Sequence, residues 1–268
     1  MIKFISLGSG SSGNCYYLNA SGHGIVIDAG IAPRSFKKFF RDYGLSQAEL
    51  HALLITHDHT DHVKAAGALS ETYHLPVFAT EKVHQGMQRN FLMKKKVAEA
   101  DKRVIQPCET FDCGPCRITP FPVPHDSNDN NGYFIEVEGL RFCLITDAGH
   151  ITEEMESFIR RADYLVIEAN YDEQMLQNGP YPPHLKRRIS CGGGHLSNVA
   201  TAETLARHLP KSARRVWLCH LSEENNHPEL ARKQVETALL AADFPVGTTL
   251  QVDVLKRKMP TGIYELSL

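Results

Sequence analysis

The sequence lacks any long hydrophobic run, and this absence excludes a membrane protein. Its longest apolar segments have the length of a β-strand, as in the Ala-Leu-Leu-Ile segment at residues 52–55, whereas a membrane-spanning helix needs about 20 apolar residues. The first seven residues run directly into a glycine- and serine-rich turn, without the apolar stretch and cleavage site of a secretory signal. We therefore expect a cytoplasmic protein with no membrane partner.

The chain also lacks an excess of either charge, with 29 basic and 31 acidic residues and a formal net charge of −2. This balance excludes binding of nucleic acid by overall charge, although short basic segments could still bind phosphates locally. Solvated surfaces are the ordinary explanation of such segments. They occur at residues 94–96, 186–188, 214–215 and 256–258, and only the second lies beside a motif with chemical content.

The chain has an odd number of cysteines, 7, and this favours reduced thiols over a disulfide framework. Cys113-Gly-Pro-Cys116 has the spacing of a redox dithiol, and Cys108 adds a spacing shared with some iron–sulfur proteins. A redox dithiol leads into a helix, but the two prolines soon after Cys116 oppose one. We interpret the motif as a turn between strands, with redox or electron-transfer chemistry at these cysteines as an alternative.

The length of 268 residues and the hydrophobic content of 42% suffice for a full core without disulfides. Strand-like segments are followed by alternating helix-like and strand-like segments, and this order occurs twice. The pattern predicts one α/β domain over residues 1–268, in two similar halves whose sheets pack face to face with helices outside. It also predicts a largely helical segment at residues 82–96 and a long irregular segment, of a kind that usually carries function, at residues 170–194.

Potential metal ligands are concentrated in the segment His57-Asp58-His59-Thr60-Asp61-His62, which directly follows the apolar residues 52–55. Imidazole and carboxylate groups together suit zinc, manganese or iron. Side chains two apart in an extended segment share a side, so His57 and His59 can bind one ion, and Asp61 and His62 can bind a second around the next turn. The alternative is a histidine-rich surface loop.

This His-x-His-x-Asp-His pattern after a buried strand resembles the signature of the metallo-β-lactamase superfamily. The resemblance covers nearly the whole chain and implies a four-layer αββα sandwich with two divalent metal ions, Zn, Mn or Fe. It implies that Asp147 bridges the ions and that Asp28 and Glu168 support the ligands from behind. The implied metal ligands are His57, His59, Asp61, His62, His125, Asp147 and His220.

Several of these positions also have ordinary structural explanations. A single histidine at a strand end, such as His125 or His220, more often has a structural role. Asp28 could cap a turn, and Asp147 could be a loop aspartate after a strand. What favours the metal site is the order in which all these residues occur along the chain.

A Gly-His-Leu-Ser motif around His195, preceded by Glu168-Ala169, resembles ribonuclease Z and its phosphodiesterase relatives. The resemblance implies a binuclear phosphodiester hydrolase in which His195 protonates the leaving oxygen and Asp61 orients the attacking water. A histidine at a helix start, bonded to the neighbouring backbone, is the alternative for His195.

Residues 8–14, 185–189 and 220–226 resemble the YycJ (WalJ) subfamily, whose members are described as DNA exonucleases. This implies a 5′–3′ exonuclease with DNA as its partner and a role in DNA repair. Residues 126–130 depart from the pattern, in which a proline is expected. A small-molecule or cyclic-nucleotide phosphodiesterase, or a ribonuclease, is the alternative, and the missing large basic face favours the small substrate.

Further residues are candidates for binding the substrate. Arginine and lysine bind phosphates through charge-assisted hydrogen bonds, which predicts this role for Lys186, Arg187 and Arg188. Ser222, Asn225 and Asn226 are weaker candidates, because such residues also cap helices, here one starting near Pro228. The residues alone leave the metal, the polarity of degradation and the oligomeric state open.

Overall fold

A computed structural model describes all residues, 1–268, and contains two seven-stranded mixed β-sheets. The first sheet has the order β14 (Tyr264–Leu266), β1 (Ile2–Gly8), β2 (Cys15–Ala20), β3 (His23–Ile27), β4 (Leu50–Leu54), β5 (Val77–Ala79) and β6 (Lys102–Val104). The second has the order β13 (Gln251–Val254), β12 (Arg215–Cys219), β11 (Tyr164–Glu168), β10 (Leu140–Ile145), β9 (Asn131–Val137), β8 (Cys116–Pro122) and β7 (Phe111–Cys113).

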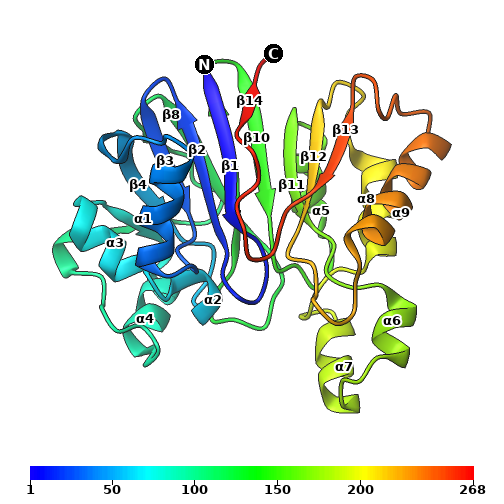
Figure 1. Cartoon of the computed structure of the whole chain (residues 1–268), viewed down its shortest axis with the longest axis horizontal. Helices are drawn as coiled ribbons and strands as arrows, with labels where there is room; N and C mark the ends of the chain where they lie inside the picture. Colours follow the sequence, from blue (N-terminus) through cyan, green and yellow to red (C-terminus); the bar gives the residue numbers. More distant parts are fainter.

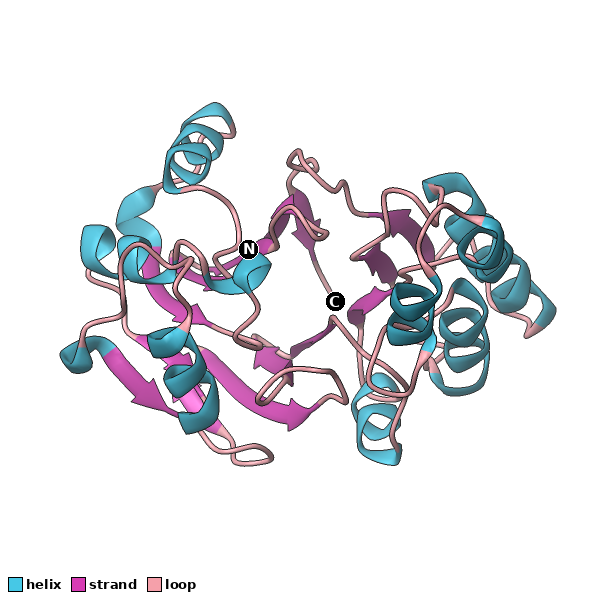
Figure 2. Ribbon diagram, turned by 90° about the horizontal axis from the view of Figure 1, so that it is seen from below, coloured by secondary structure: helices cyan, strands magenta, loops and turns pink.

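Helices cover the outer faces of both sheets, so that the strands lie in the middle of the molecule (Figures 1 and 2). On the first sheet lie α1 (Pro33–Asp42), α2 (Thr60–Val63), α3 (Ala66–Tyr73) and α4 (Glu81–Arg89). On the second lie α5 (Glu153–Ile159), α8 (Asn198–His208) and α9 (Pro228–Ala241), while α6 (Glu173–Asn178) and α7 (Pro183–Ser190) project from one end. The predicted αββα sandwich is therefore confirmed. None of the helices has both the length and the apolar character needed to cross a bilayer.

Three apolar layers hold the sandwich together, one between the sheets and one between each sheet and its helices. In the middle layer, the ring of Phe4 lies 5.1 Å from that of Phe142 and 4.6 Å from that of Trp217, which joins β1 to β10 and β12. The central parallel strands are buried on both faces, as their continuous apolar sequences require. Burial of the apolar side chains between the sheets therefore holds them face to face.

The parallel strands determine where polar side chains gather. Strands β3, β4 and β5 run parallel to one another, as do β10, β11, β12 and β13. The carboxyl ends of parallel strands meet at one edge of a sheet, where α/β proteins bind ligands. The segments that leave or end these strands carry Asp28, His57, Asp147, Glu168 and His220.

Two sequence predictions are wrong in part. The helix expected at residues 82–96 ends at Arg89, because Asn90 has an extended backbone and its side chain bonds to Asp58 and Thr60. The segment at residues 170–194, expected to be irregular, contains α6 and α7. These helices are short, and they depend on a small cluster of Tyr171, Leu176 and Ile189 that local sequence does not reveal.

The cysteine motif forms the predicted turn, with Cys113 and Cys116 facing each other at the ends of β7 and β8. Burial raises the pKa of the Cys113 thiol to about 11 and that of Cys116 to about 12. Both thiols are therefore protonated at neutral pH. Redox and cluster chemistry need the thiolate, so this arrangement disfavours the electron-transfer alternative.

Candidate metal centre

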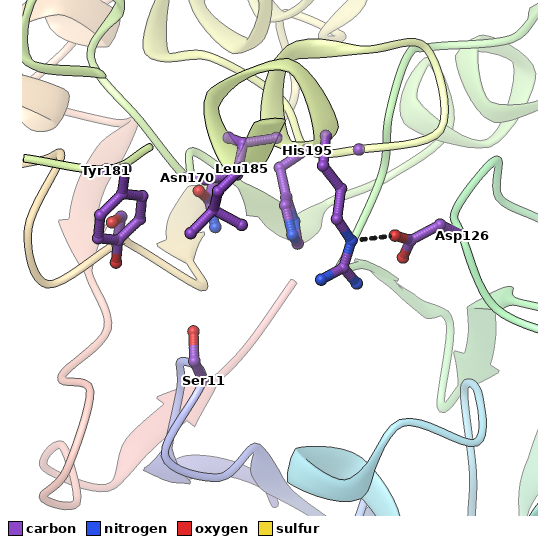
Figure 3. Close-up of a pocket in the computed structure, with 10 residues that line it drawn as sticks. Ser11, Asp126, Asn170, Tyr181, Leu185 and His195 are labelled. Carbon is purple, nitrogen blue, oxygen red and sulfur yellow. Dashed lines mark hydrogen bonds and ion pairs between the residues drawn. The ribbon is translucent and has the colours of Figure 1, made fainter. Parts of the chain in front are cut away.

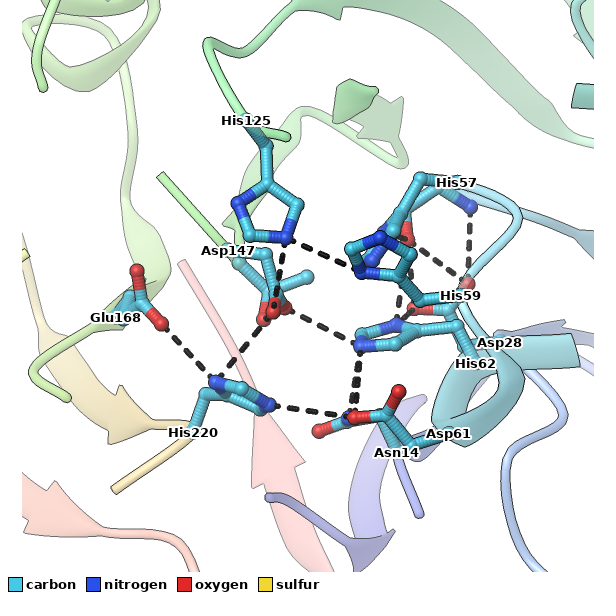
Figure 4. Close-up of polar contacts among 12 residues, drawn as sticks. Asn14, Asp28, His57, His59, Asp61, His62, His125, Asp147, Glu168 and His220 are labelled. Atoms are coloured by element: carbon cyan, nitrogen blue, oxygen red, sulfur yellow. Dashed lines mark hydrogen bonds and ion pairs between the residues drawn. The ribbon is translucent and has the colours of Figure 1, made fainter. Parts of the chain in front are cut away.

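The loops that follow β4, β8, β10 and β12 bring all seven predicted ligands to one place (Figure 4). Their nitrogen and oxygen atoms form overlapping groups, within each of which the atoms lie no more than 4.8 Å apart. The groups are His57, His59 and His125; His57, His62 and Asp147; Asp61, His62 and His220; and Asp147, Glu168, His195 and His220. Asp147 thus lies close both to His57 and His62 and to His195 and His220.

Three residues of the centre have left-handed backbone conformations. The φ angles of Asp28, Asp147 and His220 are 60°, 53° and 52°. Such angles are unfavourable for residues with a side chain and concentrate at functional sites. Each residue follows a strand end closely, so the turn directs its side chain into the centre.

Asp28 and Thr56 bind the side of the histidine loop, residues 57–62, that faces away from the centre. Oδ2 of the buried Asp28 accepts a hydrogen bond from Nδ1 of His62 at 2.7 Å, and its Oδ1 accepts one from the backbone N–H of Thr56 at 2.9 Å. The Thr56 hydroxyl lies 2.9 Å from Nδ1 of His57. Both imidazoles are therefore fixed through Nδ1, and their Nε2 atoms point into the centre.

Two of the imidazoles have a buried nitrogen without a hydrogen-bond partner. Nε2 of His57 and Nε2 of His220 are enclosed and form no hydrogen bond, a state that costs about 1–3 kcal/mol per group. Nδ1 of His220 donates to Oε1 of Glu168 at 3.0 Å. In a third imidazole, His125, Nδ1 donates to the Gly194 carbonyl at 2.9 Å. Metal-binding histidines are usually held in this way, so the residues present fit a divalent metal site.

Opposite charges lie close together in the centre and shift the pKa values of its buried groups. Burial favours the neutral form of Asp147, but His220 and His62 outweigh it and hold the pKa of this carboxyl well below its usual value. Burial likewise lowers the pKa of His220, but Asp147, Asp61 and Glu168 outweigh it and raise this pKa to about 10. Without metal ions, protonated histidines would therefore neutralise the buried carboxylates.

Glu168 connects the ligand cluster to His195. Its Oε1 accepts hydrogen bonds from Nδ1 of His195 at 2.8 Å and Nδ1 of His220 at 3.0 Å. Its Oε2 accepts the backbone N–H groups of Ala148 at 2.8 Å and Leu196 at 3.2 Å. The Asn170 amide adds a fifth, longer bond to Oε1 at 3.4 Å. These donors fix the carboxylate, and the carboxylate in turn orients the rings of His195 and His220.

A cavity of about 190 Å³ opens beside His195 (Figure 3). Ser11 faces Tyr181 and Leu185 across it, and the side chain of His195 retains 19% exposure. The cavity therefore gives a substrate access to His195.

The predicted substrate-binding residues differ in their availability. Arg188 lines this cavity, and its Nε lies 2.5 Å from Oδ2 of Asp126, which ties α7 to the centre. Nζ of Lys186 donates to the Gln177 carbonyl at 2.7 Å, whereas the exposed Arg187 forms no hydrogen bond or ion pair. Ser222 also lines the cavity.

The prediction that Asn225 and Asn226 contact substrate needs correction, because both are buried. The Asn226 amide donates to the carbonyls of Ala169 and Asn170 and exchanges bonds with Asn198. The capping alternative is also wrong for α9, since its N-cap is His227. Asn226 instead stabilises the loops around the centre, and the Asn225 amide donates to the Ser222 hydroxyl at 3.3 Å.

Sequence reasoning did not identify three polar residues of the centre: Asn14, Thr56 and Asp126. Nδ2 of Asn14 lies 2.8 Å from Nε2 of His62, and Oδ1 of Asp126 lies 3.3 Å from Nε2 of His125. Asn14 and Asp126 belong to segments already compared with the YycJ subfamily, and Thr56 directly precedes His57. The only sequence feature that could have identified these three residues is their position next to the motifs that carry the predicted ligands.

Comparison with known proteins agrees with this geometry. Residues 23–221 match the family model described as "Beta-lactamase superfamily domain". The exodeoxyribonuclease WalJ of Streptococcus pneumoniae serotype 2 is 35% identical over 250 residues, 93% of each chain. The exodeoxyribonuclease YycJ of Bacillus anthracis is 32% identical over 262 residues, 98% of each chain. The metallo-β-lactamase fold protein YhfI from Bacillus subtilis, with 17% identity, has a TM-score of 0.72 over 99% of this chain and 100% of its own, a likeness of fold alone.

Proposed function

Because this chain belongs to the β-lactamase superfamily and is a metallohydrolase, we propose that it is an exodeoxyribonuclease that degrades DNA from the 5′ end in DNA repair. The observation that carries the proposal is the placement of His195, held by Glu168, between the ligand cluster and an open cavity. A phosphodiester has a poor leaving group, and a histidine at this position can protonate it. The two exodeoxyribonuclease relatives, similar over nearly their full lengths, favour DNA as the substrate.

Seven side chains of the centre would hold two divalent ions. His57, His59 and His125 would hold one ion, Asp61, His62 and His220 the other, and Asp147 would contact both. When bound, such a pair polarises the phosphoryl group and makes a water molecule acidic enough to attack at neutral pH. Zinc, manganese and iron all suit these ligands.

Asp61 would orient the attacking water. Its Oδ2 lies 3.5 Å from the amide of Asn14, 3.7 Å from Nε2 of His62 and 3.6 Å from Nε2 of His220. No protein group bonds to its Oδ1, and the side chain is 24% exposed. That oxygen is therefore free to accept a hydrogen bond from water and then its proton.

His195 would donate the proton to the departing sugar oxygen. Glu168 holds its Nδ1, which leaves Nε2 to act on the leaving group. Burial lowers the pKa of His195, but Glu168 outweighs this effect and raises it. This shift favours the protonated ring, the form that can donate the proton.

The proposal is tested by incubating the purified protein, loaded with Mn²⁺ or Zn²⁺, with DNA labelled at the 5′ or 3′ end. We expect immediate release of the 5′ label and stepwise shortening of the 3′-labelled strand. An Asp147→Asn variant should lose this activity, while a variant of the exposed His51, His51→Ala, should keep it. Intact DNA with every metal would contradict the proposal.

A small-molecule phosphodiesterase is the second candidate. The cavity of about 190 Å³ suits a small group, and the net charge of −2 provides no large basic face. Hydrolysis of a cyclic nucleotide with no attack on DNA would favour this candidate. Degradation of labelled RNA in place of DNA would favour a ribonuclease.

A further inference from the structure

Phe91 is an exposed aromatic residue at the edge of the metal centre. It follows α4, and its 89% exposure is higher than that of any other large hydrophobic side chain in the protein. It lines a hollow of about 330 Å³ together with His59, Thr60 and Asp58 of the histidine loop. An exposed phenylalanine adds no buried apolar area to the stability of the fold, so its position beside His59, a predicted metal ligand, favours a functional explanation.

The segment that carries Phe91 is fixed by neighbouring residues on both sides. The Asn90 amide donates to the Asp58 carbonyl and to the Thr60 hydroxyl, both at 3.2 Å. Its Oδ1 accepts the backbone N–H of Leu92 at 3.1 Å, and the next residue, Met93, is buried in the core. Phe91 is thus held out into solvent between two anchored residues.

Helix α4 is itself docked on the histidine loop. A Cβ atom at Gly86 would lie 2.0 Å from Oδ2 of Asp58, so only glycine allows this close approach. Asp58 also accepts hydrogen bonds from the backbone and side chain of Asn128. The position of Phe91 relative to His59 is therefore set by packing.

Cations flank Phe91 in the sequence, and one of them, Arg89, lines the same hollow. Arg89 and Lys94 are exposed and form no ion pair, whereas Lys95 is paired with Glu71 at 2.6 Å. Lys96 donates to the carbonyls of Met87 and Asn90, which strengthens the segment. An aromatic face flanked by free cations is the usual way in which proteins bind single-stranded nucleic acid.

We propose that Phe91 stacks on a base of the DNA strand next to the scissile phosphate, while Arg89 and Lys94 bind flanking phosphates. This inference rests on the proposed function. The hollow of Phe91 includes His59, whereas the cavity of α7 includes His195. In Figure 1, α4 and α7 lie on opposite sides of α2. In a DNA strand that crosses the centre, the nucleotide on one side of the scissile phosphate would therefore lie near Phe91. The nucleotide on the other side would lie near His195.

The test compares Phe91→Ala, Phe91→Trp and Phe91→Leu with Met259→Ala, a control that removes another exposed apolar side chain. For each, kcat/KM is measured on a single-stranded oligonucleotide and on bis(p-nitrophenyl) phosphate, which has no base to stack. We expect the ratio of the two values to fall about tenfold in Phe91→Ala and Phe91→Leu. It should be retained in Phe91→Trp and in the control.

A second readout uses an oligonucleotide with 2-aminopurine near its 5′ end, bound in the presence of EDTA. Stacking on Phe91 should change the fluorescence with wild type and Phe91→Trp, but not with Phe91→Ala. Normal degradation and fluorescence with Phe91→Ala would overturn the inference while leaving the proposed function intact. A wild-type protein that neither binds nor degrades DNA would overturn both.

Discussion

Nδ1 of His195 lies 2.8 Å from Oε1 of Glu168, a carboxylate with no exposure to solvent. The contact spans 27 positions of sequence and joins the loop before α8 to the end of β11. It orients the ring of His195 and favours its protonated form. The same oxygen also binds His220, so one glutamate orients both the proposed general acid and a proposed metal ligand.

Replacing His195 with alanine should lower the rate of hydrolysis most for substrates with poor leaving groups. We expect the rate on DNA to fall about 10²–10⁴-fold, because a sugar oxygen needs a proton as it departs. The rate on bis(p-nitrophenyl) phosphate should fall much less, since nitrophenolate leaves without one. Steady-state kinetics on both substrates measures this difference. Equal losses on both would show that His195 is not the general acid.

Replacing Asp28 with asparagine should weaken metal binding. The carboxylate orients His62 through Nδ1 at 2.7 Å, and loss of such a support typically lowers metal affinity about 10–100-fold. Competition with a coloured chelator gives the dissociation constants. Asp163→Asn is the matched control, because Asp163 is also buried but pairs with Arg141. An unchanged affinity in Asp28→Asn would contradict the positioning role.

Metal binding should release protons at neutral pH. In the metal-free protein, carboxylates outweigh the effect of burial, raising the pKa of His220 to about 10 and that of His62 well above its usual value. Ligand histidines must be neutral, so metal binding displaces these protons and its affinity rises with pH up to the His220 pKa. Titration calorimetry in buffers of different ionisation enthalpy measures the release. Identical heats in all buffers at pH 7 would contradict it.

Replacing Arg187 with alanine should weaken DNA binding. Arg187 is exposed on α7 and has no protein partner, so it is available to a phosphate. Its loss should reduce the slope of log affinity against log salt by about 1. The control Arg214→Ala removes an exposed arginine directly before β12, away from the carboxyl ends of the strands. An unchanged slope in Arg187→Ala would exclude the phosphate contact.

Much of the fold could be predicted because its signals are local. Apolar strands separated by turns, and amphipathic segments between them, specify the alternation of elements regardless of distant residues. The helices α6 and α7 were not predicted, since they rely on contacts around Tyr171 rather than on a strong pattern of their own. The helical expectation beyond Arg89 was wrong because Asn90 bonds across to the histidine loop.

The sequence by itself determined the metal-ligand motif, since His57, His59, Asp61 and His62 are neighbours in the chain and their chemistry is evident from their types. Only the tertiary structure decided which distant groups meet them. Asn14 contacts His62 across 48 positions, and Asn226 is buried against loop carbonyls instead of facing substrate. The physical reason is that these contacts depend on sheet register and loop packing, which the whole core sets and no local pattern encodes.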